Sequence, residues 1–283
     1  MNVIESVQEM QQQMASVRAS GKRIAFVPTM GFLHEGHLSL LKEGRQRADV
    51  LVLSVFVNPT QFGQGEDFAD YPRNLQQDCK LAQEVGVDVV FSPTTSAMYP
   101  AGYATEVNVG NITAGLCGAS RPTHFRGVCT VVTKLFHIVQ PHVALFGAKD
   151  FQQLAVIKKM TRDLNLPIDI VGMPIFREAD GLAMSSRNVY LNVQQRQQAL
   201  ALSQAIALAR DLVNKDVRDA PTIVTTVSEH LAAHSLIRID YVDICHQLSL
   251  EPQERIDADS VLLIAAFVGQ TRLIDNAYLM DLS

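Results

Sequence analysis

Short apolar runs alternate with helix-patterned segments along the first 175 residues, and this alternation restricts the possible fold more than any other feature of the chain. The run VLVLSVFV at 50–57 is apolar almost throughout, which is typical of a parallel strand with both faces buried. Such alternation predicts a doubly wound parallel sheet whose ligand crevice lies at the carboxyl ends of the strands. Strands are expected at 23–27, 50–57, 87–91, 143–146 and 168–171.

The residues after 175 follow a different pattern. Helices are expected around 193–214 and 221–235, and strands at 239–244 and 261–268. The chain is therefore expected to be an α/β protein with two domains. Residues 1–175 would form a Rossmann-like domain, and residues 176–283 a smaller α+β domain that closes over it as a lid.

Composition and charge disfavour several classes of partner. The chain has 283 residues, a net charge of -5 and a pI near 5.9, which disfavours a nucleic-acid partner. No apolar run is long enough for a bilayer span and no secretion signal is recognisable, so no membrane association is expected. The four cysteines lack CxxC spacing, which favours reduced thiols and a cytoplasmic location.

Two histidines stand where the first strand leads into a helix. Residues 28–41 read PTMGFLHEGHLSLL, and Pro28 is expected to end the strand. A helix N-terminus attracts phosphate through its N–H groups and dipole, and the imidazoles of His34 and His37 would add donors. Histidines near a turn are also often ordinary surface residues. Zinc is disfavoured, because HEGH lacks the HExxH spacing and no cysteine pair is close in sequence.

Other polar stretches fall at expected strand ends or on loops. Lys149 could hold phosphate as a point charge, and Asp150 could accept a hydrogen bond from a ribose hydroxyl. Ser185, Ser186 and Arg187 offer hydroxyl donors and a guanidinium fork. Each stretch alone is common on protein surfaces, but together they indicate a nucleotide site without a P-loop or a GxGxxG motif. The stretches are NPTQ at 58–61, RPTH at 121–124, GAKDFQQ at 147–153 and MSSR at 184–187.

Six linked motifs carry a resemblance to a known family. In chain order they are PTMGFLHEGH, FVNPTQF, YPR, RPTHFRG, FGAKDFQQL and READGLAMSSRN, and TRLIDN at 271–276 extends them. With these the chain resembles the pantoate–β-alanine ligases (pantothenate synthetases) of coenzyme A biosynthesis, within the wider HxGH nucleotidyltransferase superfamily. The resemblance implies ATP-dependent condensation of pantoate with β-alanine through a pantoyl adenylate, releasing AMP and pyrophosphate. It also implies Mg²⁺ on the ATP phosphates and a homodimer.

The resemblance further implies roles for individual residues. Catalysis would rest on His37, His34, Lys149 and Arg187. ATP would be bound by Met30, His34, His37, Gly147, Lys149, Asp150, Phe176, Met184, Ser185, Ser186 and Arg187. Pantoate would be bound by Met30, Gln61 and Gln153. Asn58, Arg121 and His124 would be further residues of the site, and Asp78 is a candidate protein ligand of Mg²⁺.

Two positions depart from the family pattern. Cys117 and Ala148 stand where the family usually has glutamate, so two carboxylates are missing near the expected crevice. If these acids orient Lys149 or Arg121, restoring glutamate at 148 should raise the rate of adenylate formation. A catalytically silent nucleotide-binding module therefore remains an alternative.

A second alternative is another HxGH adenylyltransferase that acts on a phosphorylated acceptor. The amide side chains of NPTQ and FQQL favour an uncharged hydroxyacid group over a phosphate. Residues 62–73, FGQGEDFADYPR, contain two glycines and no clear periodicity, so this loop is a candidate moving lid.

Overall fold

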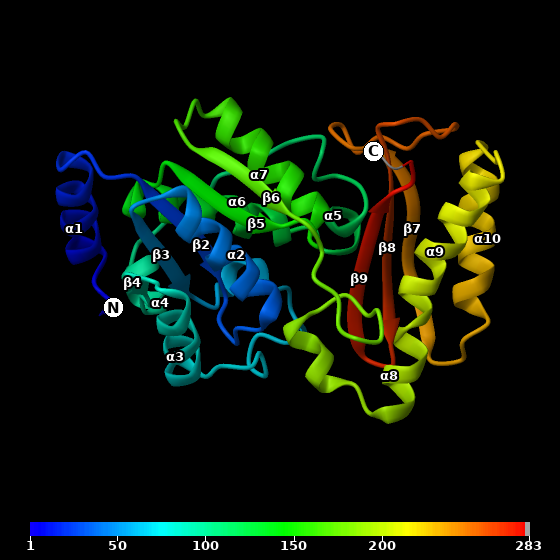
Figure 1. Cartoon of the computed structure of the whole chain (residues 1–283), viewed down its shortest axis with the longest axis horizontal. Coiled ribbons are helices and arrows are strands. Elements are labelled where there is room, and N and C mark those ends of the chain that lie inside the picture. Colours follow the sequence, from blue (N-terminus) through cyan, green and yellow to red (C-terminus); the bar gives the residue numbers. More distant parts are fainter. Residues whose placement is uncertain (281–283) are drawn as a thin grey trace. The chain divides into compact units, whose positions relative to one another are not determined.

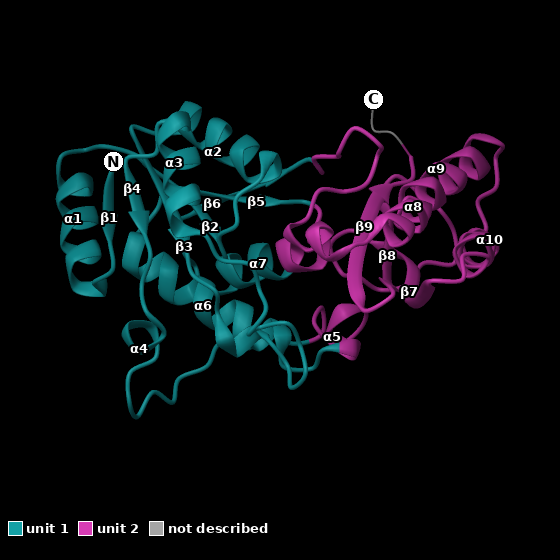
Figure 2. Ribbon diagram, turned by 90° about the horizontal axis from the view of Figure 1, so that it is seen from below, with its two compact units in different colours: residues 1–110, 121–148, 156–174 teal, residues 111–120, 149–155, 175–283 magenta. Residues whose placement is uncertain are grey.

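The computed structural model describes residues 1–280, which form two compact units (Figure 2). Unit 1 comprises residues 1–110, 121–148 and 156–174, and unit 2 comprises residues 111–120, 149–155 and those from 175 onward. The division is therefore not a single position in the sequence, because two short segments that precede 175 belong to unit 2.

Unit 1 is built on a parallel sheet of six strands, counted over residues 1–280, in the order β1-β4-β3-β2-β5-β6 (Figure 1). All neighbouring strands in it run parallel. This arrangement confirms the expected Rossmann-like sheet. The strands are β1 (Asn2–Ile4), β2 (Ile24–Thr29), β3 (Val50–Val55), β4 (Val89–Phe91), β5 (Val143–Gly147) and β6 (Asp169–Met173).

Helices cover both faces of this sheet because its central strands β2, β3 and β5 are apolar and buried on both sides. Ala25 and Val27 pack with Leu41 of α2 in one buried cluster, whereas Phe26, between them, meets Phe136 of α6 edge to face. Helix α3 packs beside α2, and α1 packs beside α6. The helices are α1 (Val7–Ala19), α2 (Glu35–Arg47), α3 (Leu75–Val85), α4 (Thr95–Met98), α6 (His124–Val139) and α7 (Phe151–Asp163), with a 3₁₀ turn η1 (Pro59–Gln61).

The strand order reverses at β2. From β2 the chain moves outward to β3 and β4, then returns to add β5 on the other side of β2. The carboxyl ends of β2 and β5 therefore flank the topological switch point, where open α/β sheets bind their ligands. The histidine motif follows β2, and GAKD at 147–150 begins at the end of β5.

The structure differs from the sequence-based expectation at three places before residue 128. Pro28 does not end the strand, since β2 continues to Thr29. The Thr29 carbonyl accepts from Phe56 on the β3 side, so Pro28 faces the β5 side, where pairing is recorded only up to Phe26. Its missing N–H therefore costs no ladder bond. The strand β1 was not expected, and the region 94–127, expected to be irregular, contains short helices and the first residues of α6.

Unit 2 contains a three-stranded antiparallel sheet in the order β7-β8-β9, counted over the described residues. One face of the sheet packs on helices α9 and α10 through a single apolar cluster that includes Ile206, Ile223 and Ile264. The expected helix 193–214 is two helices that meet at Leu200, and β9 was not expected. The elements are β7 (Ile237–His246), β8 (Ser260–Val268), β9 (Thr271–Tyr278), α5 (Cys117–Ser120), α8 (Val193–Ala199), α9 (Ala201–Asn214), α10 (Ala220–Ala232) and η2 (Ser186–Tyr190).

Helix α7 starts in the unit 2 segment 149–155 and continues in unit 1. No helix within residues 1–280 combines the length and apolar character needed to cross a bilayer.

Candidate active site

The loop between β2 and α2 is held in a tight, glycine-dependent turn. Gly31 has φ +84°, and a Cβ at this position would lie 2.8 Å from Val55 Cγ1 and 2.9 Å from Asp78 Oδ2. Its N–H donates to Thr29 Oγ1 at 3.1 Å, while Thr29 Oγ1 donates to the Ser54 carbonyl at 2.8 Å. The turn is thereby tied to β3.

Asp78, on α3, anchors the same loop from the other side. Its carboxylate accepts from the N–H of Phe32 at 2.9 Å and from the N–H of Leu33 at 2.7 Å. The residue is only 2% exposed. Burial raises the pKa of Asp78 above its usual value, while the two N–H donors act in the opposite direction. The carboxylate therefore holds the backbone that leads into the histidine motif.

His34 and His37 lie face to face at the start of α2. Their ring centroids are 4.0 Å apart, and the rings are inclined by 28°. The N–H of His34 donates to His37 Nδ1 at 3.4 Å. Because Nδ1 accepts this bond, the neutral imidazole of His37 carries its proton on Nε2. The local structure thus leaves His37 with a donor at the ring atom farther from the backbone.

Gln61 is held by the RPTH motif. Its carbonyl accepts from Arg121 Nη2 at 3.2 Å and from His124 Nδ1 at 2.9 Å. His124 is 9% exposed and begins α6, which packs directly on η1. Arg121 and His124 were expected to belong to the site, and within unit 1 they contact the backbone of Gln61.

The candidate lid, 62–73, has several anchors. Arg121 pairs through two nitrogens with the carboxylate of Glu66. Arg73 donates to the carbonyls of Phe68, Ala69 and Tyr71, and its guanidinium lies 5.3 Å from the ring centroid of Phe68. Whether the loop moves during the reaction stays a prediction, and these contacts are the ones that opening would break.

The Glu66–Arg121 ion pair is expected to make the stability of the folded loop 62–73 depend on pH. Burial would raise the pKa of Glu66, but the hydrogen bond and charge of Arg121 outweigh it and lower the pKa. A lowered carboxyl pKa stabilises the folded loop above the usual pKa, and that stability is lost as the pH falls through the lowered value. We expect Glu66→Gln to speed amide hydrogen exchange in 63–70 about three- to tenfold at neutral pH.

At acidic pH, the amide exchange rates of residues 63–70 in wild type and in Glu66→Gln should become equal after correction for intrinsic exchange rates. Glu84→Gln, at an exposed position of α3, serves as the matched control and should leave this exchange unchanged. Equal exchange in wild type and Glu66→Gln at neutral pH would contradict the role of the pair.

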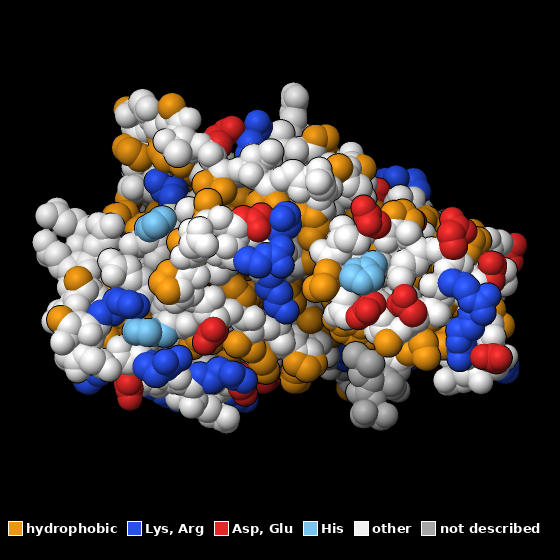
Figure 3. All heavy atoms as spheres, turned by 90° about the horizontal axis from the view of Figure 1, so that it is seen from above, with side chains coloured by type: hydrophobic (Ala, Val, Ile, Leu, Met, Phe, Trp, Pro, Cys, Tyr) orange, Lys and Arg blue, Asp and Glu red, His pale blue; other side chains and the backbone are white. Residues whose placement is uncertain are grey.

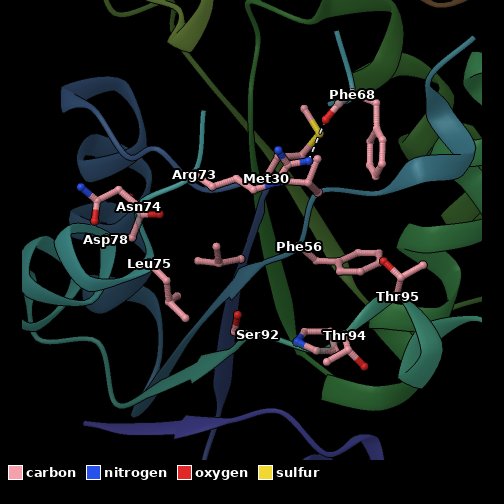
Figure 4. Close-up of a pocket in the computed structure, with 13 residues that line it drawn as sticks. Met30, Phe56, Phe68, Arg73, Asn74, Leu75, Asp78, Ser92, Thr94 and Thr95 are labelled. Atoms are coloured by element: carbon pink, nitrogen blue, oxygen red, sulfur yellow. Dashed lines mark hydrogen bonds between the residues drawn. The ribbon is translucent and has the colours of Figure 1, made fainter. Parts of the chain in front are cut away.

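A pocket of about 270 Å³ opens beside Met30, at the carboxyl ends of β3 and β4 (Figure 4). Phe56 and Thr94 line it on one side, and Asn74 and Asp78 of the α3 region on another. None of these four except Asp78 was expected at the site. Phe56 lies inside the predicted strand 50–57, Thr94 comes shortly after the predicted strand 87–91, and Asn74 immediately precedes helix α3.

The Lys149 segment is tied to β9 within unit 2. Lys149 Nζ lies 3.7 Å from Asp150 Oδ2, and the Lys149 side chain is 19% exposed. Asn276 Nδ2 donates to the Lys149 carbonyl at 2.8 Å. Its neighbour Asp275, 2% exposed, pairs through both oxygens with Arg177 at 2.7 and 2.9 Å. TRLIDN, a motif without an expected role, therefore anchors both GAKD and READG.

Gln152 has a structural task that the FQQ motif did not reveal. Its Oε1 accepts from the Cys117 N–H at 3.0 Å, and its Nε2 donates to the carbonyls of Ile112 and Gly115. Cys117, one of the two departures from the family pattern, thus lies in a segment held by this buried amide. Gln153, the expected pantoate ligand, is half-buried on α7 in the same unit.

The segment 176–190 forms a compact turn in unit 2. The Met184 N–H donates to the Phe176 carbonyl at 2.9 Å, and Ser185 caps η2 by accepting from the Arg187 N–H at 3.3 Å. Arg196 holds the turn through Glu178 at 2.6 Å. Ser186 is buried and Arg187 half-buried.

Basic side chains on the face shown in Figure 3 stand in small groups among acidic and uncharged ones, not in one broad field. Within residues 1–280 no group of three or more His, Cys, Asp or Glu is placed to hold a metal ion. Asp78 accepts one backbone N–H at each carboxylate oxygen, and its role as a Mg²⁺ ligand stays a prediction.

Comparison with known proteins identifies the family. The sequence profile of the family described as "Pantoate-beta-alanine ligase" matches residues 2–278. The pantothenate synthetase of Syntrophotalea carbinolica is 56% identical over 281 residues, covering 99% of both chains. That of Trichlorobacter lovleyi is 58% identical over 288 residues, again covering 99% of both.

Solved structures agree. Pantothenate synthetase from Thermus thermophilus superposes with a TM-score of 0.94 at 43% identity, covering 99% of this chain and 100% of that one. The pantoate–β-alanine ligase of Francisella tularensis, solved with a β,γ-ATP compound and β-alanine, gives a TM-score of 0.81 at 30% identity, covering 99% and 98%. With its motifs, fold and full-length matches in agreement, this chain belongs to the pantoate–β-alanine ligase family.

Proposed function

We propose that this enzyme joins pantoate to β-alanine through a pantoyl adenylate, with release of pyrophosphate and then AMP. The observation that carries the proposal is the stacked His34–His37 pair at the N-terminus of α2, beside the switch point of the sheet. The Francisella relative was solved with an ATP compound and β-alanine, which supports both as ligands here.

The proposed route follows from carboxylate chemistry. A carboxylate is a poor electrophile, so it must be activated before an amine can attack. The pantoate carboxylate oxygen attacks the α-phosphorus of ATP, the bond from that phosphorus to pyrophosphate breaks, and an acyl adenylate forms. The β-alanine amine then attacks the acyl carbon, AMP leaves, and the amine loses a proton. Both steps depend on positioning and on donors aimed at developing negative charge.

The proposed ligands are those of the family motifs. In unit 1, the Nε2–H of His37 and the ring of His34 donate to phosphate oxygens, and the Met30 N–H and Gln61 bind pantoate. In unit 2, Lys149 balances the phosphate charge and Arg187 with Ser185 and Ser186 holds the pyrophosphate end. The other proposed contacts are Gly147 and Asp150 to the ribose, Phe176 and Met184 to the adenine, and Gln153 to pantoate.

Further features remain part of the proposal. Residues 1–175 would bind nucleotide and pantoate, and residues 176–283 would act as the lid domain. Mg²⁺ would bind the ATP phosphates, with oxygen ligands from substrate and water. A cytoplasmic homodimer is the proposed working form, and sedimentation of the purified enzyme would measure the oligomeric state.

Pantoate-dependent exchange of labelled pyrophosphate into ATP tests the proposed function. Reversible adenylate formation predicts exchange that requires pantoate but not β-alanine. No exchange with pantoate would overturn the adenylate route. Exchange that instead requires a phosphorylated acceptor would favour the alternative adenylyltransferase.

A further inference from the structure

The side-chain amides of Asn58 and Gln61, next to the Met30 loop, each have a defined orientation of their oxygen and nitrogen atoms. Asn58, 1% exposed, caps η1, and its Nδ2 donates to the Gly127 carbonyl at 3.2 Å. A carbonyl oxygen can only accept, so the atom facing it must be the amide nitrogen. On the other side, Asn58 Oδ1 receives the Thr60 N–H at 3.4 Å, a group that can only donate. Two backbone groups therefore fix the same orientation of the Asn58 amide.

The orientation of the Asn58 amide determines that of the Gln61 amide. Asn58 Nδ2 also donates to Gln61 Oε1 at 3.1 Å. The carbonyl end of the Gln61 amide is thereby occupied, and its Nε2 lies 3.3 Å from Met30 Sδ, a weak acceptor. Gln61 thus presents N–H donors beside the loop that follows β2.

Tyr99 completes the network. Its hydroxyl donates to Asn58 Oδ1 at 2.8 Å, and Thr60 Oγ1 donates to the same oxygen at 3.0 Å. The Tyr99 ring is supported by Phe56 at 6.3 Å and by Tyr103 at 5.1 Å between centroids. Burial raises the pKa of Tyr99, so its hydroxyl keeps its proton at neutral pH.

The backbone around this network is too closely packed to admit a side chain at position 127. A Cβ on Gly127 would lie 2.4 Å from the Thr60 carbonyl oxygen and 2.6 Å from the Gln61 nitrogen. α6 therefore reaches η1 only because residue 127 is glycine. Arg121 and His124 fix the Gln61 carbonyl from the same helix region. The motif RPTHFRG clamps Gln61 in place.

We infer that Asn58 is a positioning residue that holds the Gln61 amide with its NH₂ group toward the substrate, and that Tyr99 sets the orientation of Asn58. This deepens the proposed function and rests on it. Gln61 then selects acceptor oxygens, which a hydroxyacid such as pantoate supplies through its carboxylate and hydroxyls, and it disfavours a substrate that offers only N–H donors there.

A double-mutant cycle tests the inference. Asn58→Asp keeps the shape but places an oxygen beside both the Gly127 carbonyl and Gln61 Oε1. Gln61 then turns its NH₂ group to Asp at position 58 and its oxygen to the substrate. We expect the KM for pantoate to rise about tenfold or more, while the KM for ATP changes less than about twofold. In a Gln61→Ala background, Asn58→Asp should have no further effect on the pantoate KM.

Tyr99→Phe provides a milder variant that preserves the ring packing. It should raise the pantoate KM about two- to fivefold in wild type and not at all in the Gln61→Ala background. Tyr103→Phe is the matched control and should leave both KM values unchanged.

Equal effects of Asn58→Asp with and without Gln61 would overturn the inference, as would a parallel loss for ATP and pantoate. Failure of the proposed function is a different result, because the wild-type enzyme would then form no pantothenate at all.

Discussion

His37→Ala is expected to lower the rate of adenylate formation about a thousandfold while the protein stays folded. The His37 imidazole accepts the His34 N–H at Nδ1, and this contact leaves its Nε2–H as a donor at the helix N-terminus. A donor that binds negative charge developing only as the pyrophosphate leaves stabilises mainly the transition state and not the bound substrate. The measurement is single-turnover formation of the adenylate, followed with labelled ATP and saturating pantoate.

Controls separate catalysis from folding. The contact that His37 makes with the backbone is long and half-exposed, so its loss should cost only about 1 kcal/mol of stability. His137→Ala, at an exposed position of α6, removes an imidazole without touching the site and should leave the rate unchanged. Unfolding of His37→Ala at the working temperature would show a structural histidine, and near-normal adenylation would show that another group serves the phosphates.

The parallel sheet could be predicted because its signals are local. Strands such as 50–57 are apolar on both faces, and the intervening helices carry apolar groups at helical spacing, so each element is visible in its own residues. β1 is different, since its three residues form a strand only by pairing with β4. β9 mixes polar and apolar residues, and its buried Asp275 is explained only by Arg177, 98 residues away in sequence.

The site shows the same division between local and distant contacts. His34 and His37 are three residues apart, so a helix start is enough to bring them together. The contact of His124 with Gln61 spans 63 residues and depends on α6 lying against η1. Sequence patterns could therefore nominate Arg121, His124 and Asn58 as candidate site residues. Their hydrogen-bond partners and the orientation of the Asn58 amide required the folded structure.

Asp78 is the residue whose interpretation changes most between sequence and structure. The family resemblance made it a candidate protein ligand of Mg²⁺. In the structure both oxygens accept backbone N–H groups from the turn before His34, in surroundings that leave the residue 2% exposed. The two hydrogen bonds are those expected of a loop anchor, and the role of Asp78 toward Mg²⁺ stays a prediction.

Asp78→Ala should therefore lower the free energy of unfolding by about 2–5 kcal/mol, because two buried N–H groups lose their acceptor. Asp78→Asn should be destabilised as well, since one of its two acceptors becomes a donor. Asp211→Asn, at a solvent-exposed ion pair on α9, is the matched control and should change stability by less than about 0.5 kcal/mol. Urea unfolding measures all three.

The rate of adenylate formation then separates the two roles. A displaced turn misplaces His34 and His37, so the Asp78→Asn variant should lose activity at every Mg²⁺ concentration. If Asp78 instead bound the metal, the variant would unfold like the wild type, and excess Mg²⁺ would restore its rate. Rescue by Mg²⁺ without a change in stability would refute the anchor role, because backbone N–H groups cannot be satisfied by a metal ion.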